Sequence, residues 1–215
     1  MQLAVKGFID RVGAALLLVV LAPLMAVVAM AVLLDAPGEA VLFRQRRVGR
    51  DGGDFVMLKF RTMTGDPAVV GEADLPWALG IAGGKLPGVA VDRRTRLGGF
   101  LRRVRLDELP QLINVVRGEM SLVGPRPERS CYVALFADAV PGYCSRTRMK
   151  PGITGLSQVR GLVGETSLHA RIQTDNHYID RWHLGLDLTI LLRTLPAVIS
   201  GAREPTTSEV ARVSY

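Results

Sequence analysis

The chain has 215 residues, of which 48% are hydrophobic, which is enough for one domain with a substantial core and one appended element. Its formal net charge is +7, and this balance indicates an anionic partner: nucleic acid, an acidic membrane surface or a phosphorylated substrate. Two cysteines, Cys131 and Cys144, form no C-x-x-C pair, and with three scattered histidines they offer no zinc-ligand spacing. We therefore expect reduced thiols and no structural zinc site.

The N-terminal part contains an uncharged apolar run over residues 12–34. This run exceeds the roughly 20 residues that a helix needs to cross a bilayer; it is too long for a signal peptide and lacks a convincing cleavage site. Pro23 lies in its middle and predicts a kink or a break. Basic residues flank the run on both sides, namely Lys6 and Arg11 before it and Arg44, Arg46, Arg47 and Arg50 after it. They give no orientation for a single crossing, so between a kinked spanning helix and a re-entrant hairpin we favour the hairpin.

Two short apolar segments, residues 41–43 and 55–60, predict a β-hairpin around the glycine-rich turn at 48–53. Residues 64–90 are rich in Gly, Pro, Ala and Asp, and we expect a loop there with at most one short helix. The segment 92–105 combines helical apolar spacing with six arginines. It predicts a basic helix, which is either a solvated face or an amphipathic helix on an anionic membrane.

The clearest helical pattern runs over residues 107–117. Asp107 is a good N-cap, Pro110 is acceptable in a first turn, and Gly118 suits the C-terminal cap. This spacing puts Asp107 and Glu108 at the positive end of the helix dipole, where a carboxylate stays ionised and backbone N–H groups favour phosphate. On spacing alone, a capped and solvated helix start explains both carboxylates as well.

A stiff turn follows, in which Arg126 lies between Pro125 and Pro127. Because both prolines restrict the backbone, this arginine loses little entropy when its guanidinium binds a phosphate. Further along, helical patterns cover residues 169–182 and 186–199. The second of them predicts either a core helix or another membrane-surface element.

Short motifs occur in a characteristic order along the chain. They are Phe43-Arg44-Gln45, Lys59-Phe60-Arg61-Thr62-Met63, Leu106-Asp107-Glu108-Leu109-Pro110-Gln111, Gly124-Pro125-Arg126-Pro127 and Lys150-Pro151-Gly152-Ile153-Thr154-Gly155-Leu156. In these motifs the chain resembles the bacterial sugar transferase family, the monotopic polyprenyl-phosphate phosphoglycosyl transferases. The resemblance implies an α/β fold that is helix-rich and of the α+β kind. It places a re-entrant membrane helix with a break at Pro23 in residues 1–36, a small cytosolic catalytic domain with interfacial amphipathic helices in 37–200, and a tail in 201–215.

The resemblance also implies a two-step reaction. The Asp107 carboxylate would attack the sugar-proximal phosphate of a UDP-sugar, UMP would leave, and polyprenyl (undecaprenyl) phosphate would take the sugar-1-phosphate from the aspartate. Asp107 would also be a ligand of Mg²⁺, and Glu108 would support the metal or manage protons. The cations expected to bind phosphates are Lys59, Arg61, Arg102 and Arg126. Phosphoryl transfer asks a protein mainly for positioning and charge neutralisation, which suits this set.

The implied partners are the UDP-sugar donor, the polyprenyl phosphate acceptor and membrane lipids, with a homodimer left open. The implied location is the cytoplasmic face of the bacterial inner membrane, at the first membrane step of a surface glycan pathway. Three positions depart from the family pattern: Ala22 stands where serine is common, Arg105 where serine or threonine is common, and residues 159–165 differ. The last departure is the reason that we predict no particular sugar.

Two other functions stay open at this point. One is a membrane-tethered module that binds anionic lipids or a partner through its basic face without catalysis. The other is nucleic-acid binding, but the chain has no helix-turn-helix or RNA-motif signature and few aromatic residues to stack on bases. We therefore expect no nucleic-acid partner.

Overall fold

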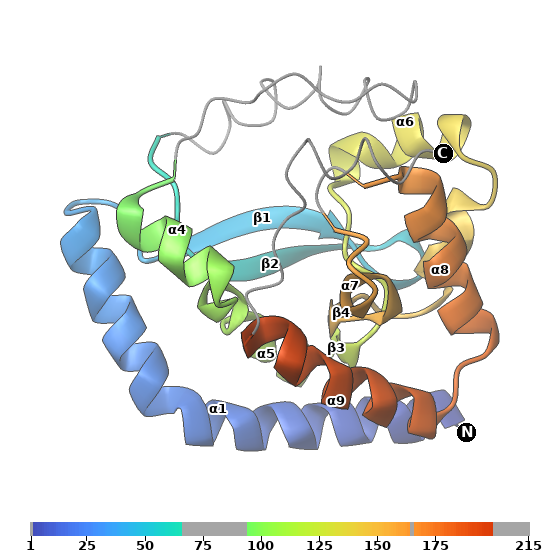
Figure 1. Ribbon diagram of the computed structural model, residues 1–215, viewed down its shortest axis with the longest axis horizontal. Coiled ribbons are helices and arrows are strands. Elements are labelled where there is room, and N and C mark those ends of the chain that lie inside the picture. Colours follow the sequence, from blue (N-terminus) through green and yellow to red (C-terminus); the bar gives the residue numbers. More distant parts are fainter. Residues whose placement is uncertain (1, 66–93, 164–165, 200–215) are drawn as a thin grey trace.

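The computed structural model describes residues 2–65, 94–163 and 166–199 (Figure 1). Most of the predicted loop at 64–90, the first residues of the predicted basic helix and the tail from 201 lie outside the described residues. In chain order the elements, with η for a 3-10 helix, are α1 (Gln2–Asp35), β1 (Leu42–Val48), η1 (Arg50–Gly52), β2 (Asp54–Phe60), α4 (Arg96–Arg103), η2 (Leu106–Glu108), α5 (Gln111–Arg117), β3 (Ser121–Val123), α6 (Ser130–Ala139), η3 (Tyr143–Arg148), β4 (Gly152–Thr154), α7 (Leu156–Val159), α8 (Leu168–Asp180) and α9 (Leu184–Ile199). This is the helix-rich α+β composition that the sequence predicts.

The N-terminal helix α1 runs along one side of the domain and then bends sharply (Figure 1). It continues through Pro23 as one helix, so the predicted break is a bend rather than an interruption. A proline inside a helix removes one backbone hydrogen bond and clashes with the preceding turn, which accounts for the bend. Among the described residues, α1 is the one helix long and apolar enough to cross a membrane.

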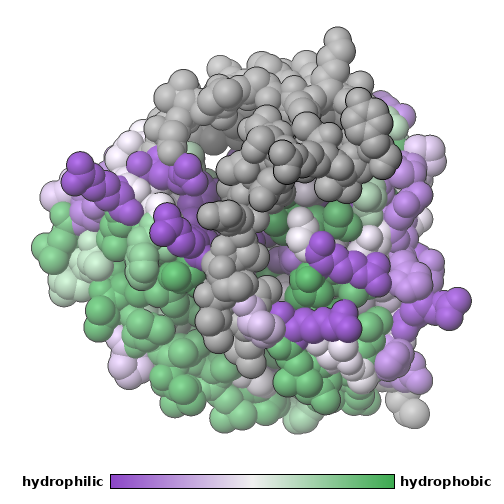
Figure 2. Space-filling model, in the orientation of Figure 1, coloured by the Kyte–Doolittle hydropathy of each residue, from purple (hydrophilic) through white to green (hydrophobic). Residues whose placement is uncertain are grey.

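Only one side of α1 packs on the domain. Ala14 belongs to a core cluster with Leu112 and Val115 of α5, and Val28 and Val32 belong to another with residues of β2 and α4. The rest of the helix surface is exposed and apolar, and Figure 2 shows hydrophobic side chains gathered where α1 runs. The most exposed of them are Phe8, Leu16, Val19, Val20, Val27, Met30 and Leu34 on α1, with Leu188 and Leu192 on α9. A surface of this extent indicates contact with lipid or with another protein.

The predicted β-hairpin is confirmed. Strands β1 and β2 pair antiparallel from Leu42 opposite Phe60 to Val48 opposite Asp54. At the turn, Asp51 and Gly52 both have positive φ values, of 56° and 83°. The first strand is longer than the predicted 41–43, because its second half consists of polar residues that carry no apolar signal.

The predicted helix over 107–117 is divided in the structure. Leu106–Glu108 form the 3-10 turn η2, and α5 begins only at Gln111, after Pro110. Before η2, Arg105 adopts a left-handed conformation with φ 59°, which costs an L-residue about 1–2 kcal/mol. Gly118 ends α5 with φ 80°, which confirms the predicted C-terminal cap.

A parallel pair of short strands was not predicted. Strand β3 pairs with β4, with Ser121 opposite Gly152 and Val123 opposite Thr154. Glycines allow the two backbones to approach closely, since a Cβ at Gly124 or Gly152 would collide with backbone atoms of the other segment. Three-residue strands are too short for a period-2 pattern, and only this contact explains why both segments are rich in glycine.

The basic helix is confirmed over part of its predicted range, as α4, with Thr95 as its N-cap. It packs closely on the end of β2: a Cβ at Gly98 would collide with the backbone carbonyl of Thr62, whereas a Cβ at the neighbouring Gly99 would meet nothing. This contact sets the distance between α4 and the hairpin, and so the position of Arg102 near the end of α4.

The two adjacent glycines of α4 provide a matched test of this packing. We expect Gly98→Ala to destabilise the protein by about 1–3 kcal/mol, because the helix must move away from Thr62. In contrast, Gly99→Ala should stabilise it by about 0.5–1 kcal/mol, as alanine does at an open helix position. Thermal unfolding in detergent measures both; equal shifts for the two variants would contradict the close contact.

Candidate active site

The candidate site depends on how α5 is attached to the open edge of β2. Asn114, which is fully buried, accepts a hydrogen bond from the Leu58 backbone N–H (3.1 Å) and donates one to the Val56 carbonyl (2.7 Å). Its side chain therefore continues the ladder on the strand edge that β1 does not cover. This attachment brings the residues just before α5 next to Lys59 of β2.

Glu108 is surrounded by cations. Lys59 Nζ lies 2.7 Å from its Oε1, Arg126 Nη1 lies 3.7 Å from the same oxygen, and Arg105 Nη1 lies 3.9 Å away. Burial by itself would raise the pKa of Glu108, but Lys59, Arg126 and Arg105 together lower it to about 2. Glu108 is therefore a permanent anion that holds Lys59 and Arg126 in place.

Asp107 has a different environment, although it is the next residue. Its side chain is only 4% exposed, and Oδ1 has no hydrogen-bond partner among the described residues. Burial raises the pKa of Asp107, with Glu108 adding to the effect, whereas Lys59, Arg102 and Arg105 oppose it. The predicted stabilisation of its charge by a helix dipole is wrong: η2 is a single 3-10 turn, and α5 starts four residues after Asp107.

Three of the four predicted phosphate-binding cations lie around this carboxylate pair. Lys59 and Arg126 contact Glu108, and Arg102, whose guanidinium lies 3.5 Å from Met63 Sδ, is close enough to Asp107 to affect its pKa. The fourth, Arg61, is directed elsewhere. Its guanidinium binds the Ala40 carbonyl (2.7 Å) and Glu39 (3.0 Å), so its role toward phosphate stays a prediction.

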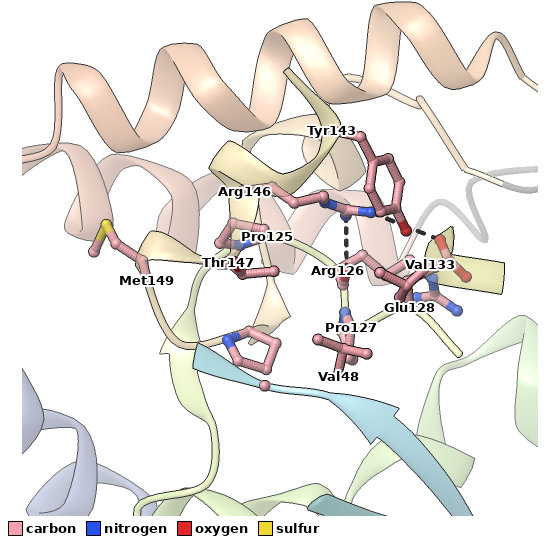
Figure 3. Close-up of a pocket in the computed structure, with 12 residues that line it drawn as sticks. Val48, Pro125, Arg126, Pro127, Glu128, Val133, Tyr143, Arg146, Thr147 and Met149 are labelled. Carbon is pink, nitrogen blue, oxygen red and sulfur yellow. Dashed lines mark hydrogen bonds and ion pairs between the residues drawn. The ribbon is translucent and has the colours of Figure 1, made fainter. Parts of the chain in front are cut away.

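The Pro125-Arg126-Pro127 turn is held on both sides by other arginines. On one side, Arg47 donates a hydrogen bond to the Pro127 carbonyl at 3.0 Å. On the other side, Arg146 of η3 donates one to the Arg126 carbonyl at 2.8 Å, as Figure 3 shows. The backbone of Arg126 is thereby fixed, which adds to the stiffness that the two prolines provide.

Arg146 is itself fixed by two carboxylates. Its Nη2 lies 2.7 Å from Asp175 of α8. Its Nη1 lies 3.7 Å from Glu128, as Figure 3 shows. Burial disfavours its charge, but Asp175 and Glu128 more than compensate and raise the pKa of Arg146. Neither Arg146 nor Asp175 was predicted, because a buried arginine and its partner carry no signal in the sequence when they lie 29 positions apart.

A narrow cleft of about 10 Å³ opens beside Glu108, lined by Lys59, Glu108, Gln111 and Arg126 among others. Fixed cations around a buried carboxylate suit a phosphorylated ligand, because the cations neutralise phosphate charge. Asp107 does not line this cleft, and its unpartnered Oδ1 is buried beside it.

The donor set also fits a magnesium ion bound mainly by substrate. The described residues contain no group of three or more His, Cys, Asp or Glu side chains that could hold a metal by themselves. Mg²⁺, however, is commonly bound through one or two carboxylates together with substrate phosphates and water. The unpartnered Oδ1 of Asp107 provides one such oxygen, whereas Oε1 of Glu108 is already occupied by Lys59.

The chain is similar to known proteins over most of its length. A family model described as bacterial sugar transferase matches residues 1–201. The chain is 43% identical over 201 residues to a UDP-glucose:undecaprenyl-phosphate glucose-1-phosphate transferase of Caulobacter vibrioides. The aligned region covers 91% of this chain and 70% of the relative. It is 39% identical over 193 residues to the protein of that name from Escherichia coli K12, covering 86% of this chain.

The relatives differ in length. The chain spans only 38% of the Escherichia coli protein. By contrast, it spans 95% of an exopolysaccharide production protein PSS from Rhizobium leguminosarum bv. phaseoli, with 39% identity over 203 residues. The matched region is therefore a shared unit that occurs with and without further sequence.

Two arginines of η3 allow a test of how the Arg126 turn is held. Arg146 and Arg148 each lie 2.7 Å from an aspartate of α8, but the first pair is buried and the second is exposed. We expect Arg146→Gln to destabilise the protein by about 3 kcal/mol or more, because Asp175 is left buried and unpaired. Arg148→Gln should cost less than about 1 kcal/mol. The shift in unfolding temperature measures both effects. Equal shifts for the two variants would contradict the conclusion that Arg146 holds the Arg126 turn in place.

Proposed function

Because this chain belongs to the bacterial sugar transferase family, we propose that it moves a sugar-1-phosphate from a UDP-sugar to undecaprenyl phosphate and releases UMP. The observation that carries the proposal is the contrast between two adjacent buried carboxylates. Glu108 is engaged by Lys59, whereas Asp107 keeps an oxygen without a partner. The relatives' names supply the donor and acceptor classes, and they make UDP-glucose the first donor to test.

In the first step, an Asp107 oxygen attacks the sugar-proximal phosphorus of the donor, and the bond from that phosphorus to the bridging oxygen breaks. UMP leaves with the bonding electrons, and the sugar phosphate remains on Asp107 as an acyl phosphate. In the second step, an oxygen of undecaprenyl phosphate attacks the same phosphorus and restores the carboxylate. Desolvation, which raises the pKa of Asp107, also leaves its ionised form less shielded by water and so more reactive.

Lys59 and Arg126 are suited to neutralise the phosphate oxygens during both steps, since Glu108 and the backbone contacts of Arg146 hold them in position. With a pKa of about 2, Glu108 stays ionised and is better suited to positioning these cations than to proton transfer near neutral pH. Mg²⁺ bound by Asp107 and the donor phosphates would supply further positive charge at the phosphorus.

We also propose that α1 is re-entrant and that the domain lies on the cytoplasmic face of the inner membrane. Both ends of α1 contact the same domain: Lys6 pairs with Asp187 of α9 at 2.7 Å, and Val32 packs with Phe60 and Leu101. A helix that crossed the bilayer would leave one end on the far side.

The first test is nucleotide release by the full chain in nanodiscs with Mg²⁺, undecaprenyl phosphate and a panel of UDP-sugars. We expect UMP with at least one donor, and a loss of roughly a thousandfold or more in Asp107→Asn, which removes the nucleophile. Asp138→Asn, at an exposed position of α6, is the matched control and should keep full activity. Release of UDP would mean that both phosphates stay with the nucleotide, and the mechanism would be wrong.

The nucleotide-release experiment also distinguishes the proposed enzyme from a binding module without catalysis. Such a module would release no nucleotide with any donor, and Asp107→Asn would then leave its lipid binding unchanged. A chelator provides an independent check on the metal, since we expect UMP release to stop when Mg²⁺ is removed and to return when it is restored.

A second test addresses the topology of α1. A tag at the N-terminus should be protected from a membrane-impermeant reagent in intact cells, like a tag inserted at Gly52 in the exposed hairpin turn. Both tags should react once the inner membrane is opened. Labelling of the N-terminal tag alone in cells with an intact inner membrane would show that α1 crosses the bilayer.

A further inference from the structure

A second cleft lies at the opposite end of α5 from the carboxylate pair. Its volume is about 330 Å³, and it is bordered by the first turns of α1, by Arg50 of η1 and by residues 148–150. Arg11, which lines it, lies against Gly118, the C-terminal cap of α5. None of the lining residues also lines the active-site cleft, and the seven residues of α5 separate the two by about 10 Å.

The lining of this cleft is strongly cationic. One carboxylate, Asp10, faces five cationic side chains, which are Lys6, Arg11, Arg50, Arg148 and Lys150. Asp10 is already occupied, because it accepts a hydrogen bond from Ser121 at 2.6 Å and lies 3.4 Å from Lys6. The cleft therefore carries a net positive charge that its own acidic residue does not balance.

Three of the five cations are paired with acidic residues. Lys6 lies 2.7 Å from Asp187, and Arg148 lies 2.7 Å from Asp180. Among the described residues, Arg50 lies 3.1 Å from Asp51, its exposed neighbour in the sequence. These pairs leave the other two cations to explain.

Arg11 and Lys150 have no carboxylate within 4 Å in the part of the chain that the structure describes. Burial lowers the pKa of Lys150, and the like charges of Arg11 and Arg50 lower it further. Cations gathered around an open cleft against their mutual repulsion are expected where an anion binds between them.

The surroundings indicate where this anion comes from. Leu3, which lines the cleft, is 43% exposed, and Phe8 and Val12, further along α1, are 68% and 44% exposed. The cleft thus lies where a basic surface meets the apolar surface of α1. A phospholipid has the same order of parts, a charged headgroup joined to acyl chains.

We propose that this cleft binds a phosphate anion, carried by the headgroup of an anionic phospholipid, between Arg11 and Lys150. The acyl chains of this lipid lie along the exposed apolar side of α1. The site is separate from the donor and acceptor of the proposed reaction, and it does not depend on that reaction. It would anchor the beginning of α1 at the membrane surface.

The test uses the full chain in a neutral detergent, titrated with dioctanoyl phosphatidylglycerol, dioctanoyl phosphatidylcholine or inorganic phosphate. Retained lipid is counted by native mass spectrometry, and the unfolding temperature is followed in parallel. We expect phosphatidylglycerol to bind more tightly than phosphatidylcholine. The double variant Arg11→Gln/Lys150→Gln should weaken phosphatidylglycerol binding about tenfold or more, since each basic residue near a membrane surface contributes appreciably to anionic lipid binding.

The matched control is Arg46→Gln/Arg160→Gln, which removes two exposed charges that lie outside the cleft. It should bind phosphatidylglycerol like the parent. Because the double variant relieves repulsion between cations, its unfolding temperature without lipid should not fall. If it does fall, Arg50→Gln is the milder variant, and we expect it to show a smaller loss of phosphatidylglycerol binding. Binding should also be unchanged in Asp107→Asn, which separates this test from that of the proposed reaction.

Two results would overturn the proposal. One is equal binding of the two lipids, or an equal loss in the double variant and the control, which would mean that only overall charge matters. The other is inorganic phosphate that binds as tightly as the lipid and is lost in the same variant, which would assign the cleft to a soluble anion instead of a headgroup.

Discussion

The attachment of α5 to β2 through Asn114 is the constraint on which the rest of the site depends. A two-stranded sheet leaves one edge of β2 open, and an unpaired edge is costly when it is buried. Asn114 satisfies both a donor and an acceptor of that edge with one side chain. Since η2 directly precedes α5, the same attachment places Glu108 against Lys59, and the position of Asp107 follows from that of its neighbour.

Next to this attachment, the adjacent acidic residues Asp107 and Glu108 have different roles. Glu108 is balanced by cations, and its low pKa makes it a fixed part of the structure. Asp107 is buried with one oxygen free, so its charge is more costly and its reactivity higher. The stability of the surrounding turn comes from Arg146 and Asp175, which touch neither carboxylate but hold the backbone of Arg126.

Helix α1 packs on the domain with one side only. Its buried side contacts α5, β2 and α4, so its placement and that of the active-site elements are coupled. Its other side is apolar and exposed. The basic cleft near its beginning and the cations of α4 lie at opposite ends of this apolar surface, which is the arrangement expected of a domain that rests on an anionic leaflet.

The sequence by itself determined the apolar N-terminal helix with its bend at Pro23, the hairpin, α4, the cap at Gly118 and the family to which the chain belongs. Each of these depends on local composition, on periodicity or on an ordered set of motifs. Only the tertiary structure decided that Asp107 lies in a buried 3-10 turn with a raised pKa, that Arg61 pairs with Glu39, and that Arg146 supports Arg126. These features depend on burial and on contacts between residues far apart in the chain, and a desolvation penalty or an ion pair exists only once the surrounding elements have packed.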